Sequence, residues 1–112
     1  MMIVMKIDIT TKNITLDAPL KVFVNEKMGA LNKFLSGTDT VLRIEIGRPS
    51  RHHKKGEVFY AEANVKVGKS LFRGSTTHED LRAAIVEVKE ELHLQLKKFK
   101  DKNTEKVRRL RS

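Results

Sequence analysis

The sequence of 112 residues contains no cysteine, which removes several kinds of chemistry at once. Disulfide bonds, thiolate zinc sites and thiol nucleophiles are all excluded. A reducing cytosol permits a chain without cysteine, although this absence alone says little about compartment. The expected location is the cytoplasm. At this length one domain is expected, and it can bury roughly two-thirds of its unfolded surface without covalent staples.

Long apolar runs are also missing. The most apolar stretch, MMIVMKIDIT at the N-terminus, is interrupted by Lys6 and Asp8. A signal peptide needs a longer uninterrupted apolar region, and a membrane-spanning helix needs about 20 apolar residues. The sequence therefore predicts neither, and no membrane partner.

Groups that could carry catalysis or bind a metal are sparse. The histidines are His52, His53, His78 and His93, and none form the i, i+4 pair of a helical zinc site. His78 and His93 are about 22 Å apart along one helix, too far to act on the same phosphate. The glycines stand singly, so no glycine-rich phosphate loop is present. We expect no enzymatic activity, no metal and no cofactor.

Exposed aromatic residues are few as well. The phenylalanines fall on predicted core faces, and Tyr60 is the one aromatic residue on a predicted solvent face. Proteins that read single-stranded RNA usually stack its bases on exposed aromatic rings. If this chain binds RNA, recognition therefore rests on phosphates and shape instead of base identity.

Positive charge is what the sequence has in excess. Its 23 basic and 14 acidic residues give a net charge of +9. Residues 97–112 carry eight basic and two acidic residues, and residues 48–55 carry four basic residues and no acid. Two basic segments on a nearly neutral body suggest a polyanionic partner. The alternative is that this charge serves solubility and that the C-terminal segment is a frayed tail.

Periodicity predicts four strands and two helices. Alternating residues indicate strands at 3–10, 41–47, 57–67 and 70–75, with a hairpin turn at Gly68-Lys69. Asp17 as N-cap and Pro19 in the first turn open a helix that we expect to end at Gly37. Thr77 followed by Asp80 resembles a capping box that opens a second helix extending to residue 102.

The order β-α-β-β-β-α predicts an α+β fold with a four-stranded sheet and two helices packed on one face, as in double-stranded-RNA-binding domains. Because a helix connects the first two strands, we expect them to be parallel. The other face of the sheet, with Lys6, Arg43 and Tyr60, meets solvent. We expect the domain to span residues 3–102, and residues 103–112, which lack an apolar face, to form a basic, disordered tail.

The second helix has three chemically distinct sides on a helical wheel of about 100° per residue. The apolar side contains Leu81, Ala84, Ile85, Val88, Leu92, Leu96 and Phe99, and the basic side contains Arg82, Lys89, His93, Lys97 and Lys100. Glu87, Glu90, Glu91 and Asp101 make up the acidic side. The basic side is a ridge of roughly 27 Å that could follow several phosphates. The alternative is structural, because late lysines suit the helix dipole and their stems cover apolar edges.

Both predicted helices resemble those of the bacterial ribosome hibernation-promoting factors. In the second helix, the resemblance lies in Asp80-Leu81-x-Ala83-Ala84-Ile85 and Leu92-x-x-Gln95-Leu96-x-Lys98-x-Lys100. In the first, it lies in Pro19, Leu20-Lys21, Val24, Glu26-Lys27, Leu31 and Lys33-Phe34. The resemblance covers about residues 3–102. Where family members often read Leu-Glu-Arg-Gln-Leu, this chain reads Leu92-His93-Leu94-Gln95-Leu96.

The resemblance implies a translation inhibitor that binds rRNA of the small ribosomal subunit, in the mRNA and tRNA channel at the A and P sites, during starvation or stationary phase. It implies RNA contacts from Lys21, Lys27, Lys33, Lys89, Lys97, Lys98 and Lys100. The wheel adds Arg82, and the basic loop adds Arg48, Arg51, Lys54 and Lys55 as secondary candidates. Long members carry a C-terminal domain that pairs ribosomes, so we expect a short form or a fragment here.

Two other functions are considered beside this one. A free-standing double-stranded-RNA module has a related architecture, but such modules usually open the last helix with lysines, where this chain has Glu79 and Asp80. A protein-interaction regulator could use the open sheet face, although its mixed charges make a poor adhesive patch. The expected partner is the small ribosomal subunit, with no DNA partner, and the protein is expected to be a monomer.

Overall fold

The chain folds in the order of elements that the sequence predicts. The computed structural model describes residues 6–35, 40–49 and 58–111, with side chains to Lys102. The elements are β1 (Lys6–Lys12), α1 (Ala18–Gly29), the 3-10 helix η1 (Ala30–Phe34), β2 (Val41–Gly47), β3 (Phe59–Val67), β4 (Ser70–His78) and α2 (Leu81–Arg111). The predicted α+β class and β-α-β-β-β-α order are confirmed.

The strands form one sheet in the order β1-β2-β3-β4. β1 and β2 are parallel, as their helical connection predicts, and the other neighbours are antiparallel. The β3–β4 hairpin turns at Gly68, whose φ of 61° is in the left-handed region that glycine adopts without strain. The edges of the sheet are therefore β1 and β4.

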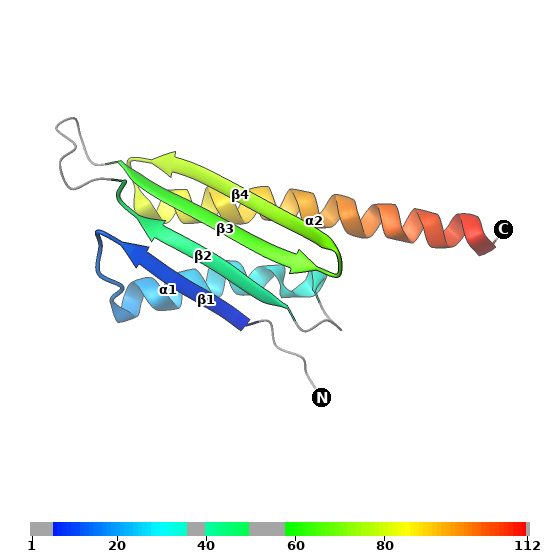
Figure 1. Cartoon of the computed structure of the whole chain (residues 1–112), viewed down its shortest axis with the longest axis horizontal. Helices are drawn as coiled ribbons and strands as arrows, with labels where there is room; N and C mark the ends of the chain where they lie inside the picture. Colours follow the sequence, from blue (N-terminus) through cyan, green and yellow to red (C-terminus); the bar gives the residue numbers. More distant parts are fainter. Residues whose placement is uncertain (1–5, 36–39, 50–57, 112) are drawn as a thin grey trace.

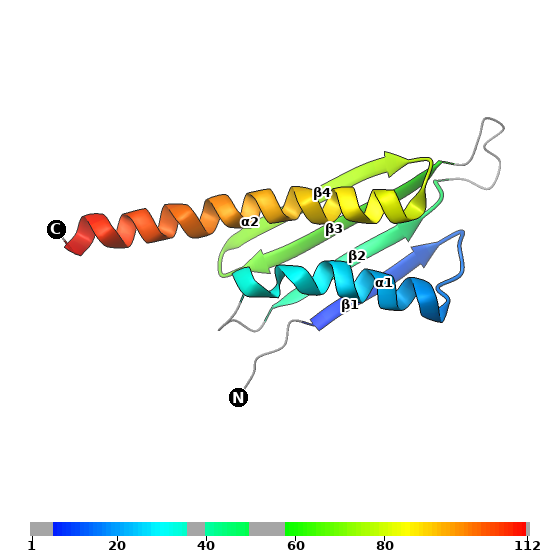
Figure 2. The same ribbon diagram turned by 180° about the vertical axis from the view of Figure 1, so that it is seen from behind.

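Both helices cover the same face of this sheet, and the other face is open (Figures 1 and 2). The covered face carries apolar side chains from each inner strand, among them Leu42, Ile44, Ala61, Ala63 and Val65, all nearly or fully buried. The small side chains of β3 leave room for the helices to pack closely. These residues, the apolar side of α2 and the buried residues of α1 and η1 form the core.

The first helix ends earlier than the sequence predicts. Asp17 caps it as expected, because the side-chain Oδ1 accepts a hydrogen bond from the backbone N–H of Leu20 at 2.9 Å. The α-helix stops at Gly29, and the chain continues as the tighter helix η1 instead of as one helix to Gly37. Glycine weakens a helix interior, which explains a break there. Met28, the residue before the break, is fully buried.

The second helix begins with a different cap from the one predicted. Thr77 belongs to β4, which runs on to His78, so the capping box centred on Thr77 is wrong. The cap is Asp80, whose Oδ1 accepts from the backbone N–H of Arg82 at 3.0 Å and whose carbonyl accepts from that of Ala84. The ring nitrogen Nδ1 of His78 in turn accepts a hydrogen bond from the backbone N–H of Asp80 at 2.9 Å.

The second helix is also longer than predicted. It has 31 residues, so at about 1.5 Å per residue it is about 46 Å long. Its C-terminal part projects beyond the end of the sheet (Figure 1). The backbone of residues 103–111 continues this helix, whereas the sequence led us to expect a disordered tail there. Within the described residues, no helix is long and apolar enough to span a membrane.

Candidate nucleic-acid interface

The apolar side of α2 faces the sheet. Ala84, Ile85, Val88 and Leu92 are completely buried, and Leu96 is 1% exposed. Their spacing of three or four residues places them in one row along the helix. This row fixes the rotation of α2 on the sheet, and with it the directions in which the charged sides point.

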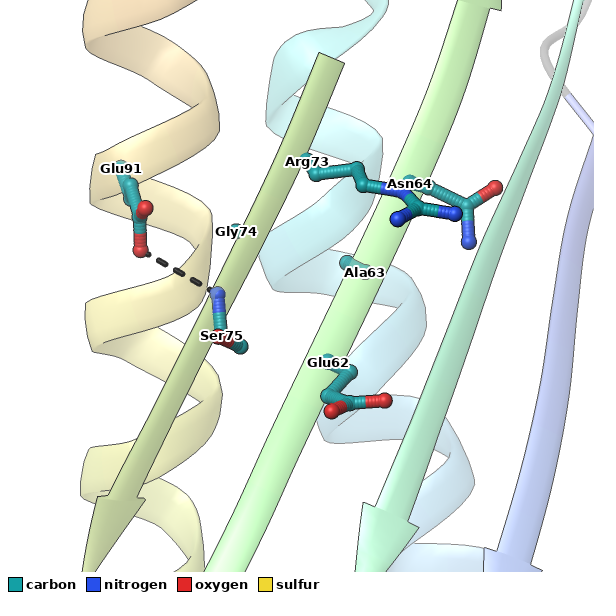
Figure 3. Close-up of a pocket in the computed structure, with 7 residues that line it drawn as sticks. All are labelled: Glu62, Ala63, Asn64, Arg73, Gly74, Ser75 and Glu91. Carbon is teal, nitrogen blue, oxygen red and sulfur yellow. Dashed lines mark hydrogen bonds between the residues drawn. The ribbon is translucent and has the colours of Figure 1, made fainter. Parts of the chain in front are cut away.

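One flank of α2 is bound to the edge strand β4. The carboxylate Oε2 of Glu91 accepts a hydrogen bond from the backbone N–H of Ser75 at 3.3 Å (Figure 3). The amide Nε2 of Gln95 donates to the carbonyl of Arg73 at 2.6 Å. A side chain at Gly74 would come within 3.2 Å of the Glu91 carboxylate, so the helix and the strand edge approach closely there. These contacts satisfy backbone groups that an edge strand otherwise leaves open.

Glu87 extends the same contact toward the N-terminus of α2. Its Oε2 accepts a hydrogen bond from the hydroxyl of Thr76 at 2.7 Å. Its Oε1 lies 3.9 Å from Nε2 of His78. The acidic side of α2 therefore has a structural role at the sheet edge, which the helical wheel alone did not reveal.

The opposite flank of α2, which carries the cations, faces α1. The guanidinium carbon of Arg82 lies 4.8 Å from the ring centroid of Phe23 in α1. The ammonium of Lys27, one helical turn after Phe23, lies 5.5 Å from the same centroid. A cation within about 6 Å of an aromatic ring is attracted by the electron-rich ring face. Arg82 and Lys27, from two different helices, thus meet at one ring.

A second aromatic ring repeats this arrangement further along the two helices. The ring of Phe34 in η1 packs against that of His93 in α2, with centroids 5.0 Å apart and planes at 85°. The ammonium of Lys33 lies 5.2 Å from the centroid of Phe34. The imidazole of His93 and the ammonium of Lys33 therefore both contact the ring of Phe34, where η1 and α2 meet.

Three more lysines lie on this flank of α2. Lys89 lies between Arg82 and His93 in the sequence, and its side chain is half-buried. Its ammonium pairs with the carboxylate of Glu90 at 3.2 Å. Lys97 and Lys100 are exposed, and helical periodicity places them on the same side as Arg82 and His93. We call this surface the basic seam, and it consists of Lys27, Lys33, Arg82, Lys89, His93, Lys97 and Lys100.

The sequence and the fold can be compared with those of known proteins. A family model described as Sigma 54 modulation protein / S30EA ribosomal protein matches residues 7–104. The chain belongs to this family. A search of curated proteins gives no significant match. The family description indicates a ribosome-associated modulation factor.

Two solved structures resemble this S30EA-family chain in fold. The N-terminal domain of Protein Y from Thermus thermophilus has a TM-score of 0.73 and 22% identity, over 85% of this chain and 99% of that one. A ribosomal subunit interface protein from Coxiella burnetii has a TM-score of 0.69 and 17% identity, over 87% of this chain and 99% of that one. At these identities the comparison establishes a shared architecture.

Two of the lysines expected to contact RNA, Lys21 and Lys98, lie away from the basic seam. Lys21 is exposed on the flank of α1 opposite to Lys27, because the buried row of Leu20 and Val24 runs between them. Lys98 lies on the β4 side of α2 and lines a groove with Leu71 and other side chains. The structure therefore groups Lys27 and Lys33 with α2, but not Lys21 or Lys98.

The secondary candidates of the basic loop are only partly described. Arg48 follows β2, its backbone N–H donates to the carbonyl of Lys12 at 3.0 Å, and its guanidinium lies 5.1 Å from the ring centroid of Phe59. It is half-buried and thus contributes to packing at the end of the sheet. Arg51, Lys54 and Lys55 lie outside the described residues.

The open face of the sheet carries charges of both signs. Arg43 lies beside Asp8 on one side and Asn64 on the other, and Asn64 lies beside Arg73 (Figure 3). In the neighbouring row, Glu45 of β2 lies opposite Glu62 of β3. Adjacent charges of opposite sign offer no continuous positive surface to a polyanion.

Tyr60, expected to be the exposed aromatic residue, is half-buried on this face. Its hydroxyl donates a hydrogen bond to Oε2 of Glu45 at 3.0 Å. Burial, that hydrogen bond and the charges of Glu45 and Glu62 raise the pKa of Tyr60 to about 12. A ring held in this way is poorly placed to stack on a base, in keeping with recognition through phosphates.

Proposed function

We propose that this protein is a ribosome-associated translation inhibitor that binds rRNA of the small subunit. It occupies the channel of the mRNA and of the tRNA anticodon stems at the A and P sites, in the cytoplasm, and preserves idle ribosomes during starvation or stationary phase. The observation that supports this most is the basic seam, in which cations of two helices lie along one line. Family membership supports the ribosome as the partner.

The arrangement of charge around α2 explains how one surface of a small domain can serve RNA. Two acids of that side, Glu87 and Glu91, are turned toward β4 and bonded to Thr76 and Ser75, so these two carboxylates do not face a polyanion bound at the seam. The cations project on the other flank, over a ridge of roughly 27 Å from Arg82 to Lys100. Neutralising phosphates along it releases counterions, which makes binding strongly dependent on salt.

Co-sedimentation with isolated small subunits at rising salt tests this proposal. We expect the logarithm of the binding constant to fall linearly with the logarithm of salt concentration, by roughly 0.7–0.9 per phosphate contacted. Replacing Lys89, Lys97 and Lys100 by Glu should abolish both binding and inhibition of translation. A variant with Lys6, Arg43 and Lys66 replaced by Glu makes the same change in net charge on the open face, and should still bind.

Each result has a defined meaning if all variants melt like the wild type. Absence of binding at low salt would reject the ribosome as the partner. Equal loss in the two triple variants would show that net charge matters and the seam does not. Tight binding to plain duplex RNA would favour the double-stranded-RNA module, although Asp80 at the start of α2 places a carboxylate where such modules usually carry lysines.

A further inference from the structure

Two phenylalanines of the first helical segment, Phe23 and Phe34, contact side chains of the basic seam. Phe23 receives a cation from each helix, Arg82 at 4.8 Å and Lys27 at 5.5 Å. The ammonium of Lys33 lies 5.2 Å from the ring centroid of Phe34. The His93 ring packs on Phe34 in a T-shaped arrangement, with centroids 5.0 Å apart. Both rings are half-buried against the core, so they are fixed by packing on one side and meet cations on the other.

We infer that Phe23 and Phe34 are positioning residues of the RNA-binding surface. Their rings hold the neighbouring cations in place before RNA arrives. Long flexible side chains lose rotational freedom when they grip a phosphate, and a cation already restrained by a ring loses less of it. The inference rests on the proposed function, and it assigns to two apolar side chains a role in affinity.

A ring suits this task better than a carboxylate does. An acidic partner would also restrain a lysine or an arginine, but it would cancel the charge that attracts phosphate. The face of an aromatic ring attracts a cation without carrying net charge. A stacked guanidinium also keeps its in-plane N–H donors available.

The ion pairs in the structure agree with this difference between a ring and a carboxylate as the partner of a cation. Among the residues that the structure describes, no carboxylate forms an ion pair with Lys27, Lys33 or Arg82, the three cations held at rings. Lys89, which has no ring contact among the described residues, pairs instead with Glu90. Within the described part of the chain, the three cations at the rings are therefore not neutralised by a paired carboxylate, whereas Lys89 is.

Replacing Phe23 by Leu tests the inference, because Leu keeps an apolar side chain but has no ring. We expect its dissociation constant for small subunits to rise about three- to tenfold, in line with the modest strength of exposed cation–π contacts. Phe23→Tyr retains the ring and should restore binding. Phe72→Leu is the matched control: Phe72 is also half-buried but packs on Phe99 at 5.2 Å on the β4 side, so it should not weaken binding.

A double-mutant cycle separates positioning from general support of the fold. In a background of Arg82→Gln with Lys27→Gln, Phe23→Leu has no cation left to position and should cost nothing further. A structural role would weaken binding by the same factor in both backgrounds. Equal losses would therefore overturn the inference, as would wild-type affinity for Phe23→Leu alone.

NMR gives a readout that does not depend on the ribosome. In the wild-type protein, ring currents should displace the side-chain resonances of Arg82 and Lys27 from their usual positions, and Phe23→Leu should remove this displacement. Undisplaced resonances in the wild type would overturn the inference even if small subunits bind. If the resonances are displaced as expected but the wild type binds no small subunits, the proposed function fails while the positioning of the cations stands.

Discussion

The carboxylate of Glu91 accepts a hydrogen bond from the backbone N–H of Ser75, and this contact joins the middle of α2 to the outer edge of the sheet. Glu91 belongs to the acidic side of the helix, which a wheel diagram presents as a solvent-facing surface. Together with the hydrogen bond between Thr76 and Glu87, this contact gives two acids of the helix a structural role at β4, on the flank opposite to the basic seam.

The first prediction concerns this contact. Glu91→Ala should lower the free energy of unfolding by about 0.5–1.5 kcal/mol, since it leaves a strand N–H without its acceptor. Glu90→Ala is the matched control, because Glu90 makes only an exposed pair with Lys89 that is worth little. Urea denaturation followed by circular dichroism measures both. Equal stability of the two variants would contradict a structural role for Glu91.

The second prediction compares two leucines of α2. Leu92 is completely buried and Leu94 is 58% exposed. Leu92→Ala should destabilise the protein by roughly 2–5 kcal/mol, because it leaves a cavity in the core. Leu94→Ala should change stability by less than about 0.5 kcal/mol. Thermal melting of both variants checks the rotation of α2 on the sheet; a large effect at Leu94 would mean that the helix faces another way.

The third prediction concerns Tyr60. It is the one tyrosine of the sequence, so its titration can be followed by absorbance without a signal from another tyrosine. In the folded protein the phenol should titrate near pH 12 instead of near 10. Because the folded state holds this proton more tightly, Tyr60 contributes its full stabilisation below about pH 10, and that contribution is lost as the pH rises toward 12.

Glu45→Gln provides the control for this titration. It removes a negative charge beside the phenol, so the pKa should fall toward 10 but remain above it, because burial still acts. Circular dichroism recorded along the titration shows whether the fold is intact. A midpoint near 10 in a folded wild-type protein would contradict the environment described for Tyr60.

The fourth prediction uses two adjacent lysines on different sides of α2. Lys97 lies on the basic seam, and Lys98 lies beside the groove next to β4. Lys97→Glu should weaken binding to small subunits severalfold and reduce its salt dependence. Lys98→Glu makes the same charge change and should weaken binding less. A larger effect at Lys98 would place the RNA on the β4 side of the helix.

Patterns of alternating and helical residues were sufficient to predict a four-stranded sheet, the parallel pairing of its first two strands and the packing of both helices on one face. Ile44, Ala63 and Val65 each lie where period-two alternation places them. Local signals at the ends of elements were less reliable. Thr77 and Asp80 fit a capping box, but pairing of Thr77 with Tyr60 across the sheet extends β4 and moves the cap to Asp80.

The helical wheel predicted a basic side of α2, and the contacts of Arg82 and His93 with α1 and η1 agree with it for those two residues. The wheel could not show which neighbour each flank meets. That Lys98 lies beside β4, and that Lys21 lies on the far flank of α1, follows only from how the helices sit on the sheet. The ring contacts of Phe23 and Phe34 were missed because half-buried phenylalanines look like ordinary core residues in a sequence. The i, i+4 spacing of Phe23 and Lys27 was the available signal.

The closed edge at β4 limits how copies of this protein can associate. Growth of a fibre by adding strands needs two available edges on every molecule, one to accept the preceding copy and one to offer to the next. Here Glu91 and Gln95 of α2 occupy the N–H of Ser75 and the carbonyl of Arg73 in the middle of β4. An added strand would have to displace these contacts, so growth through the β4 edge is disfavoured relative to pairing through β1.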